Sequence, residues 1–208
     1  MTHSTVLSPA QRPTRKTPAV IPQLAWRDER YGVGPYAWLS PGLNSSTAYV
    51  RLSRGLACVF LTASHGPLSH QQVGHLGFAE HQLWNAIGSH LAGLADAASD
   101  AFWVRAPHPS LGRAPGQLPP GVEVQARGRT AAGWLAHPQS FQRLHHHLVA
   151  TLRPRHELTY YVGDNDTLFA FDATAREVAQ TLGWERLMRY SLGFPLLAVP
   201  PRAPLRFS

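Results

Sequence analysis

The sequence has one cysteine, one lysine, few acidic residues and no long hydrophobic run. Cys58 is the only thiol among 208 residues, which excludes an internal disulfide and a zinc cluster built on thiolates. Its place in the apolar run LACVFL predicts a buried, unreactive thiol. No run of about 18 apolar residues occurs, and the first 20 residues lack the apolar core of a signal peptide. We therefore expect a soluble, cytoplasmic protein with no membrane insertion.

Arginine carries almost all of the positive charge. The net charge is +7 at pH 7, and every basic residue except Lys16 is an arginine. The excess is greatest between residues 101 and 163, where only Glu123 and Glu157 oppose the candidate nucleic-acid-binding residues Arg105, Arg113, Arg127, Arg129, Arg143, Arg153 and Arg155. Such a run suits either a solvated basic surface or contact with phosphates. No helix-turn-helix, zinc-finger or aromatic RNA-binding pattern accompanies it.

The composition changes along the chain and predicts three segments. Residues 1–22 are rich in Pro, Ser, Thr and Arg without periodicity, which predicts a disordered basic tail. We expect the folded domain over 23–193, with a proline-rich loop at 107–121. Residues 194–208 are again proline-rich and are expected to form a C-terminal tail on the surface.

The pattern before residue 107 predicts a hairpin, a helix and a strand. Two strand-like runs between about 48 and 62 are joined by Arg54-Gly55, and the second run, 56–62, is expected to be central. A helix follows, with Ala79 at its N-cap, Gln82 at N3 and apolar residues spaced along one face: Leu83, Trp84, Ile87, Leu91 and Leu94. The run AFWVRA at 101–106 predicts a short strand.

The pattern after residue 121 predicts two further hairpins and two helices. VEVQARGRTAAGWLA contains two strand-like runs around Arg127-Gly128. A helix is expected to begin at Pro138 with a core face of Phe141, Leu144, Leu148 and Leu152. Thr174 and Glu177 have capping-box spacing for a last helix ending near Gly183, and WERLMRYSLG is expected to add a turn or two of helix.

The stretch LTYYVGDNDTLFAF at 158–171 places Gly-Asp-Asn-Asp between two apolar runs. These residue types favour positive φ and bonds from side chain to local backbone, as a hairpin connection requires. We therefore interpret Asp164 and Asp166 as structural turn residues and not as metal ligands. Removal of either carboxylate is expected to affect stability, and Asp166 more than Asp164.

The order of elements resembles the YtpQ-like family of uncharacterised bacterial proteins. The similar stretches are GLACVFL (55–61), HLGFAEHQLW (75–84), RTAAGWLAHPQSFQRL (129–144) and LTYYVGDNDTLFAF (158–171), so the resemblance spans about 50–182. The turn differs, because the family more often has a proline and an arginine before the aspartate that aligns with Asp166. The resemblance implies an α/β (α+β) fold: one domain with an antiparallel-rich sheet built from hairpins and about three packed helices. It implies no activity.

Patterns that carry chemistry are scarce. Consecutive histidines such as His145, His146 and His147 point about 100° apart on a helix and cannot converge on one ion. His65, His70, His75 and His81 could meet Glu80 only through tertiary structure. There is no GxSxG elbow, Walker loop or GxGxxG, so no catalytic residue, metal or cofactor is assigned.

These observations favour a non-enzymatic module that binds another protein through its loops, including 107–121. An immunity protein or a mobile-element accessory protein would fit. Two alternatives stay open: a nucleic-acid-associated basic protein that uses the seven arginines, and a metal-dependent hydrolase that uses His and Asp residues such as Asp164, Asp166 and Asp172.

Overall fold

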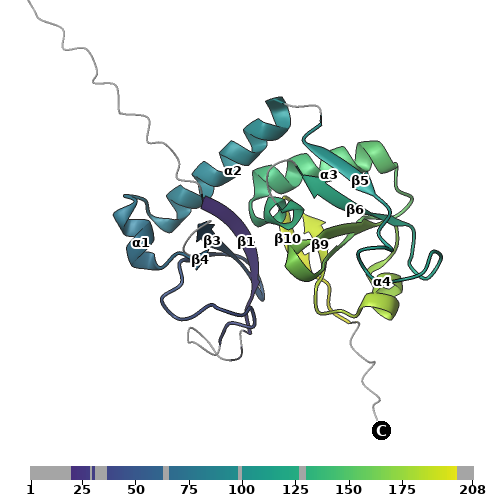
Figure 1. Cartoon of the computed structure of the whole chain (residues 1–208), viewed down its shortest axis with the longest axis horizontal. Coiled ribbons are helices and arrows are strands. Elements are labelled where there is room, and N and C mark those ends of the chain that lie inside the picture. The colour runs from purple at the N-terminus through teal and green to yellow at the C-terminus, as the bar shows by residue number, and fades with distance from the viewer. Residues whose placement is uncertain are drawn as a thin grey trace, which may run out of the picture.

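Two antiparallel sheets form the frame of the protein, and helices pack between and around them (Figure 1). The structure is a computed structural model, and it describes residues 20–28, 30, 37–62, 66–97, 100–126 and 130–200. The expected α+β fold in a single domain is confirmed. No helix in these ranges is long and apolar enough to cross a membrane.

The first sheet is built around the predicted hairpin. Its strands are β1 (Val20–Trp26), β2 (Tyr49–Ser53), β3 (Leu56–Thr62) and β4 (Gly66–Pro67). β3 lies between β1 on one side and β2 and β4 on the other, so its predicted central place is confirmed. Gly55 has φ +75° in the β2–β3 turn, a conformation that glycine adopts without steric cost.

The second sheet has six strands in the order β10-β9-β7-β8-β6-β5. They are β5 (Phe102–Arg105), β6 (Gly121–Ala126), β7 (Thr159–Val162), β8 (Leu168–Phe171), β9 (Leu187–Ser191) and β10 (Phe194–Leu197). The prediction of helix in WERLMRYSLG was wrong, because this stretch contains β9, which pairs with β7. Leu187 and Met188 bury on opposite faces of the sheet, and a short apolar run of this kind fits a strand as well as a helix.

The helices begin and end largely where their caps predict. They are α1 (His70–His75), α2 (Glu80–Ala97), α3 (Pro138–Leu152) and α4 (Ala175–Leu182). Ala79 N donates to Gln82 Oε1 at 3.1 Å at the start of α2, and Pro138 occupies the first turn of α3. Thr174 and Glu177 form both bonds of the predicted capping box of α4. α1 was not predicted.

The stretch after Arg127-Gly128 is not the predicted strand. Residues Ala131–Ala136 form a fully buried 3-10 helix, η3. A Cβ on Gly133 would lie 2.7 Å from the carbonyl oxygen of Pro22, so the small residues of this segment allow its backbone to approach β1 closely. The close contact with β1, and not the local strand-like pattern, determines the conformation of residues 131–136.

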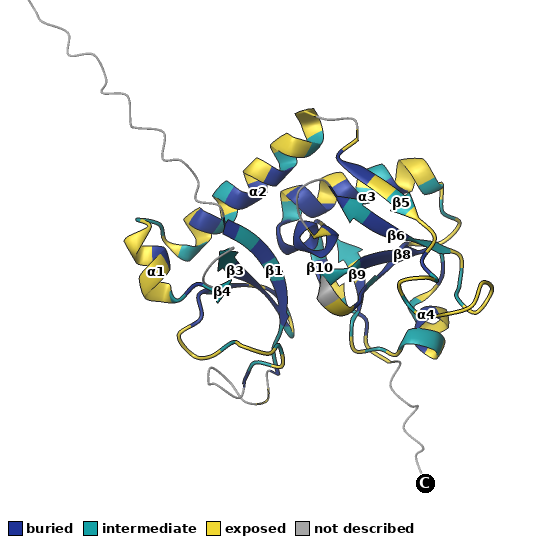
Figure 2. Ribbon diagram, in the orientation of Figure 1, coloured by how far each residue is buried: buried dark blue, intermediate teal, exposed yellow. Residues whose placement is uncertain are grey.

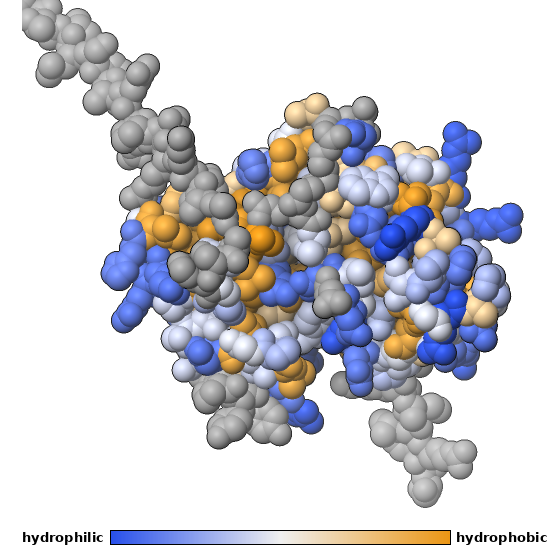
Figure 3. All heavy atoms as spheres, viewed as in Figure 1, coloured by the Kyte–Doolittle hydropathy of each residue, from blue (hydrophilic) through white to orange (hydrophobic). Residues whose placement is uncertain are grey.

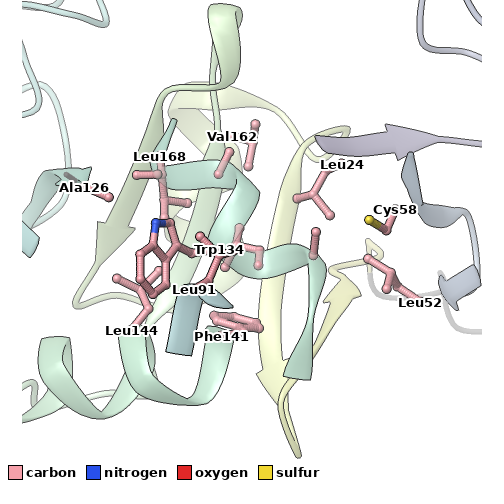
Figure 4. Packing of buried hydrophobic residues seen from close by; sticks show 14 of the residues in the cluster. Leu24, Leu52, Cys58, Leu91, Ala126, Trp134, Phe141, Leu144, Val162 and Leu168 are labelled. Carbon is pink, nitrogen blue, oxygen red and sulfur yellow. The ribbon is translucent and has the colours of Figure 1, made fainter. Parts of the chain in front are cut away.

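The core is continuous between the two sheets. The main cluster joins Leu24, Leu52 and Cys58 from the first sheet to Trp134, Leu168 and other residues of η3, α2, α3 and the second sheet (Figure 4). In Figure 2 the buried colour follows the inner face of α2 and covers η3. A second cluster on the opposite face of the six-stranded sheet packs Phe169 and Phe171 under α4 and the 107–121 loop.

The predicted segment boundaries need correction at both ends. β1 begins at Val20, inside the predicted tail of residues 1–22, because its residues pair with β3 from Val20↔Thr62 onward. Residues 194–197 form β10 and belong to the sheet, so the C-terminal segment is shorter than the predicted 194–208. Residues 1–19 and 201–208 of the two predicted tails lie outside the described residues.

Candidate functional site

The Gly-Asp-Asn-Asp segment is a turn, as predicted from its residues. It forms one turn of 3-10 helix, η4 (Asp164–Asp166), between β7 and β8. Gly163 N donates to Thr167 O at 2.8 Å and closes the hairpin. A Cβ on Gly163 would lie 2.7 Å from Thr167 Oγ1 and 3.0 Å from a ring carbon of Phe169, so a larger residue would have to displace these side chains.

The Asp166 side chain, however, bonds to a residue outside the turn. Gln23 Nε2 on β1 donates to Asp166 Oδ2 at 2.6 Å, a bond between residues 143 positions apart in sequence. We expected the Asp166 carboxylate to accept hydrogen bonds from nearby backbone N–H groups. In the structure it accepts a hydrogen bond from the Gln23 side chain. The turn is therefore fastened to the edge strand of the first sheet.

Asp166 combines an unusual backbone with an unusual environment. Its φ is +56°, which is uncommon for a residue other than glycine, although aspartate and asparagine tolerate it best. Burial raises the pKa of its carboxyl, while the Gln23 hydrogen bond and the charge of Arg186 act in the opposite direction. A half-buried carboxyl with a perturbed pKa beside a cleft is a common feature of binding and catalytic sites.

Asp164 lies on the outer side of the same turn and is bound by a cation. Its carboxylate is 93% exposed and accepts a hydrogen bond from Arg186 Nη1 at 2.9 Å. The Arg186 guanidinium also lies over the Trp26 ring, 5.8 Å from its centroid. Arg186 therefore links η4 to the end of β1 through one ion pair and one cation–π contact.

These residues line a cleft of about 900 Å³ between the first sheet and η4, which we call the inter-sheet cleft. Its polar wall consists of Gln23, Ser40, Asp164, Asp166, Glu185 and Arg186. Its apolar wall includes Trp26, Leu39, Pro41, Leu43, Leu61 and Pro67. Leu39 is 63% exposed, so part of this apolar wall is open to solvent.

Two smaller hollows lie on the α4 side of the second sheet. One of about 340 Å³ is lined by Arg113, Tyr161 and Asp164, so η4 separates it from the inter-sheet cleft. The other, of about 710 Å³, lies between residues 116–120 and α4. The inter-sheet cleft is the largest of the three, and of the three it alone is lined by both the half-buried Asp166 carboxylate and several apolar side chains. It is therefore our candidate functional site.

Three of the seven candidate nucleic-acid-binding arginines, Arg105, Arg113 and Arg143, bond to other groups of the protein through their side chains. Arg127 and Arg129 lie outside the described residues. Arg143 pairs with Asp96 at 3.0 Å, and Arg113 Nη2 donates to Thr181 O at 3.3 Å. Arg153 and Arg155 are exposed near the end of α3. In Figure 3, hydrophilic side chains project from the β5, α3 and α4 side of the molecule, with hydrophobic patches between them. Nucleic-acid binding stays a prediction.

Arg105 forms an ion pair with Glu123, which the distribution of charge along the sequence did not predict. Its Nη2 lies 2.6 Å from Oε1 of Glu123, a carboxylate on β6 that is fully buried. Burial raises the pKa of Glu123, but the bonds from Arg105 and Ser110 outweigh burial and hold that pKa below its usual value. Because Ser110 belongs to the 107–121 loop, this cluster fixes the loop over the sheet.

The histidines do not converge. The His145 ring stacks on Tyr190 with centroids 4.0 Å apart, and its Nδ1 lies 2.7 Å from Tyr160 Oη. His70 Nδ1 lies 2.7 Å from Glu80 Oε1. Within the described ranges, no three His, Cys, Asp or Glu residues are grouped so that they could hold a metal ion. His65 lies outside those ranges.

Cys58 is buried on β3, as its apolar setting predicts. Burial raises the pKa of its thiol, so the thiolate that a nucleophile needs is disfavoured. Cys58 is therefore a core residue.

No protein-family model matches the chain, and neither a curated protein nor a solved structure matches it. The resemblance to the YtpQ-like family accordingly stays a prediction.

Sequence reasoning found the turn and missed the rest of the cleft. Gln23, Trp26 and Arg186 come from two strands or strand ends that are far apart in sequence, and none of them belongs to a local motif. The one available signal was Asp166, a polar residue in a turn between two buried strands.

Proposed function

We propose that the protein is a non-enzymatic binding module that engages another protein through the inter-sheet cleft. The observation that carries this proposal is the pairing of an open apolar wall with a charged wall in one concave surface. Protein-binding sites typically place apolar contacts beside a few oriented polar groups. A role as an accessory or immunity protein is compatible with such a surface.

The polar groups of the cleft support a binding role in preference to a catalytic one. The Asp166 carboxylate is held by Gln23, and the Asp164 carboxylate is held by Arg186. Carboxylates fixed in this way present a defined pattern of charge to a ligand. Fixed charge and exposed leucine together favour recognition of a complementary protein surface.

The test is affinity purification from the native host with one variant inside the cleft and one outside it. Leu39→Arg places a long cation on the apolar wall, and because Leu39 is exposed this change costs little stability. Leu192→Arg is the matched control, since Leu192 is 90% exposed and does not line the cleft. The free energies of unfolding of both variants, measured by urea titration, should equal that of the wild type to within about 0.5 kcal/mol.

We expect a stoichiometric partner to co-purify with the wild type and with Leu192→Arg, and to be lost with Leu39→Arg. Equal recovery with both variants would place the binding surface elsewhere. Absence of any stoichiometric partner of the wild type would count against a binding module.

A further inference from the structure

We propose that the inter-sheet cleft receives an arginine side chain of the partner protein, flanked by an apolar residue. This inference rests on the proposed function and deepens it, because it names the chemistry that the cleft recognises.

The charge of the polar wall is complementary to a cation. It contains three carboxylates, Asp164, Asp166 and Glu185, and one guanidinium, that of Arg186. Arg186 is paired with Asp164, which leaves Asp166 and Glu185 to attract a second cation. Asp166 is tied to the neutral amide of Gln23, so a guanidinium could add charge-assisted hydrogen bonds there.

Arg186 is an internal example of the recognition that we propose. Its guanidinium is held by a carboxylate on one side and by the Trp26 ring on the other. A planar, weakly hydrated guanidinium suits this combination better than an ammonium does, because it bonds in its plane and stacks on its face. The same wall therefore favours arginine over lysine.

The apolar wall specifies what adjoins the cation. Leu39, Leu43 and Leu61 line the same cleft as the carboxylates, and Leu39 is 63% exposed. A leucine-sized side chain next to the incoming arginine would cover Leu39, and the alkyl stem of the arginine would also pack on apolar surface. The apolar contacts would contribute most of the affinity, whereas the carboxylates would select for a positively charged ligand.

The test uses a blocked peptide, acetyl-Leu-Arg-Leu-amide, titrated into the full chain. The neutral control replaces arginine by citrulline, which keeps the shape and removes the charge. The anionic control replaces it by glutamate. Binding is followed by NMR through the indole N–H of Trp26, whose signal is assigned by its disappearance in Trp26→Phe. Trp26 Nε1 is buried without a hydrogen-bond partner in the described part of the chain, so its shift is a sensitive local reporter.

We expect the arginine peptide to shift the Trp26 signal with saturation, and the citrulline peptide to bind at least about threefold more weakly. Asp166→Asn should weaken binding of the arginine peptide by a similar factor. The matched control is Asp96→Asn, which removes an exposed carboxylate of α2 and should leave the affinity unchanged.

The Arg186→Ala variant tests whether the cleft binds a cation or an anion. It removes the resident cation, so binding of the arginine peptide should become tighter, while Arg189→Ala, an exposed arginine of β9 outside the cleft, should have no effect. An anion site would behave oppositely, because it would lose affinity with Arg186→Ala.

Tighter binding of the glutamate peptide, equal binding of the arginine and citrulline peptides, or no shift at any peptide concentration would overturn the arginine proposal. In each case the proposed function is judged separately, since co-purification of a stoichiometric partner with the wild type does not depend on the charge of the ligand.

Discussion

Gln23 Nε2 on β1 donates a 2.6 Å hydrogen bond to Asp166 Oδ2 in the β7–β8 turn, which fastens the second sheet to the edge strand of the first. The bond also forms part of the polar wall of the inter-sheet cleft. The same contact thus contributes to the stability of the fold and to the shape of the candidate site.

Substitution of Asp166 should separate its backbone role from its charge. Asp166→Ala removes the acceptor of Gln23 and places alanine at φ +56°, so it should lower the free energy of unfolding by about 1–2 kcal/mol. Asp166→Asn retains an acceptor and tolerates this φ, so its cost should be below about 0.5 kcal/mol. Asp164→Ala should also cost less than about 0.5 kcal/mol, because that pair is exposed. Urea midpoints measure all three, and equal losses for Asp164→Ala and Asp166→Ala would contradict the assignment.

Two glycines of α2 should respond to alanine with opposite signs. A Cβ at Gly88 would lie 2.2 Å from the His137 ring, so Gly88→Ala should destabilise by about 1–3 kcal/mol despite the better helix propensity of alanine. Nothing lies within 4 Å of a Cβ at Gly93, so Gly93→Ala should stabilise by about 0.5–1 kcal/mol. Thermal or urea unfolding measures both. A neutral Gly88→Ala would mean that His137 does not occupy this space.

Stability should fall as the pH is lowered from 7 to 5. Burial lowers the pKa of His137 and of His145 to about 4, from an ordinary value of 6.5, with His146 adding to the effect at His145. The unfolded chain therefore takes up these protons first, and stability is lost as pH falls through 6.5 towards 4. Over this window the two histidines together should cost about 1–3 kcal/mol. Above pH 5 the carboxylates with lowered pKa, such as Asp172, stay ionised in both states.

His145 can be tested separately in a Tyr160→Phe background, which removes the hydroxyl that His145 contacts. His145→Phe in that background keeps a ring against Tyr190 and removes one titrating group. The slope of unfolding free energy against pH between 7 and 5 should become shallower. An unchanged slope would show that His145 does not contribute to the pH dependence.

The ion pair between the exposed Arg105 and the buried Glu123 should show strong coupling. Arg105→Ala leaves the buried carboxylate without its charged donor, and the loss should be about 1–3 kcal/mol. In a Glu123→Gln background the same change should cost clearly less, because no buried charge is left unpaired. Urea midpoints of the two single variants and the double variant give the coupling. If the losses of unfolding free energy in the two single variants simply add in the double variant, Arg105 and Glu123 are not coupled. Arg105 would then be available for another role, such as the predicted contact with phosphates.

Local patterns in the sequence determined much of the secondary structure. The Arg54-Gly55 hairpin, the start of α2 at Ala79, Pro138 in the first turn of α3 and the capping box at Thr174 were all read from residues within about four positions of one another. Such signals report interactions between near neighbours, so they hold wherever the rest of the chain lies. The turn at 163–167 belongs to the same group.

The tertiary structure alone decided the segments that depend on distant partners. Residues 131–136 became a 3-10 helix because Gly133 meets the Pro22 carbonyl, and 187–197 became strands because β7 offers an unpaired edge to β9. The cleft is of the same kind, since Gln23, Asp166 and Arg186 meet only when the two sheets pack. Bonds across 143 positions have no local signature, so the sequence by itself specified the turn that carries Asp166, and the packing of the sheets made it one wall of a site.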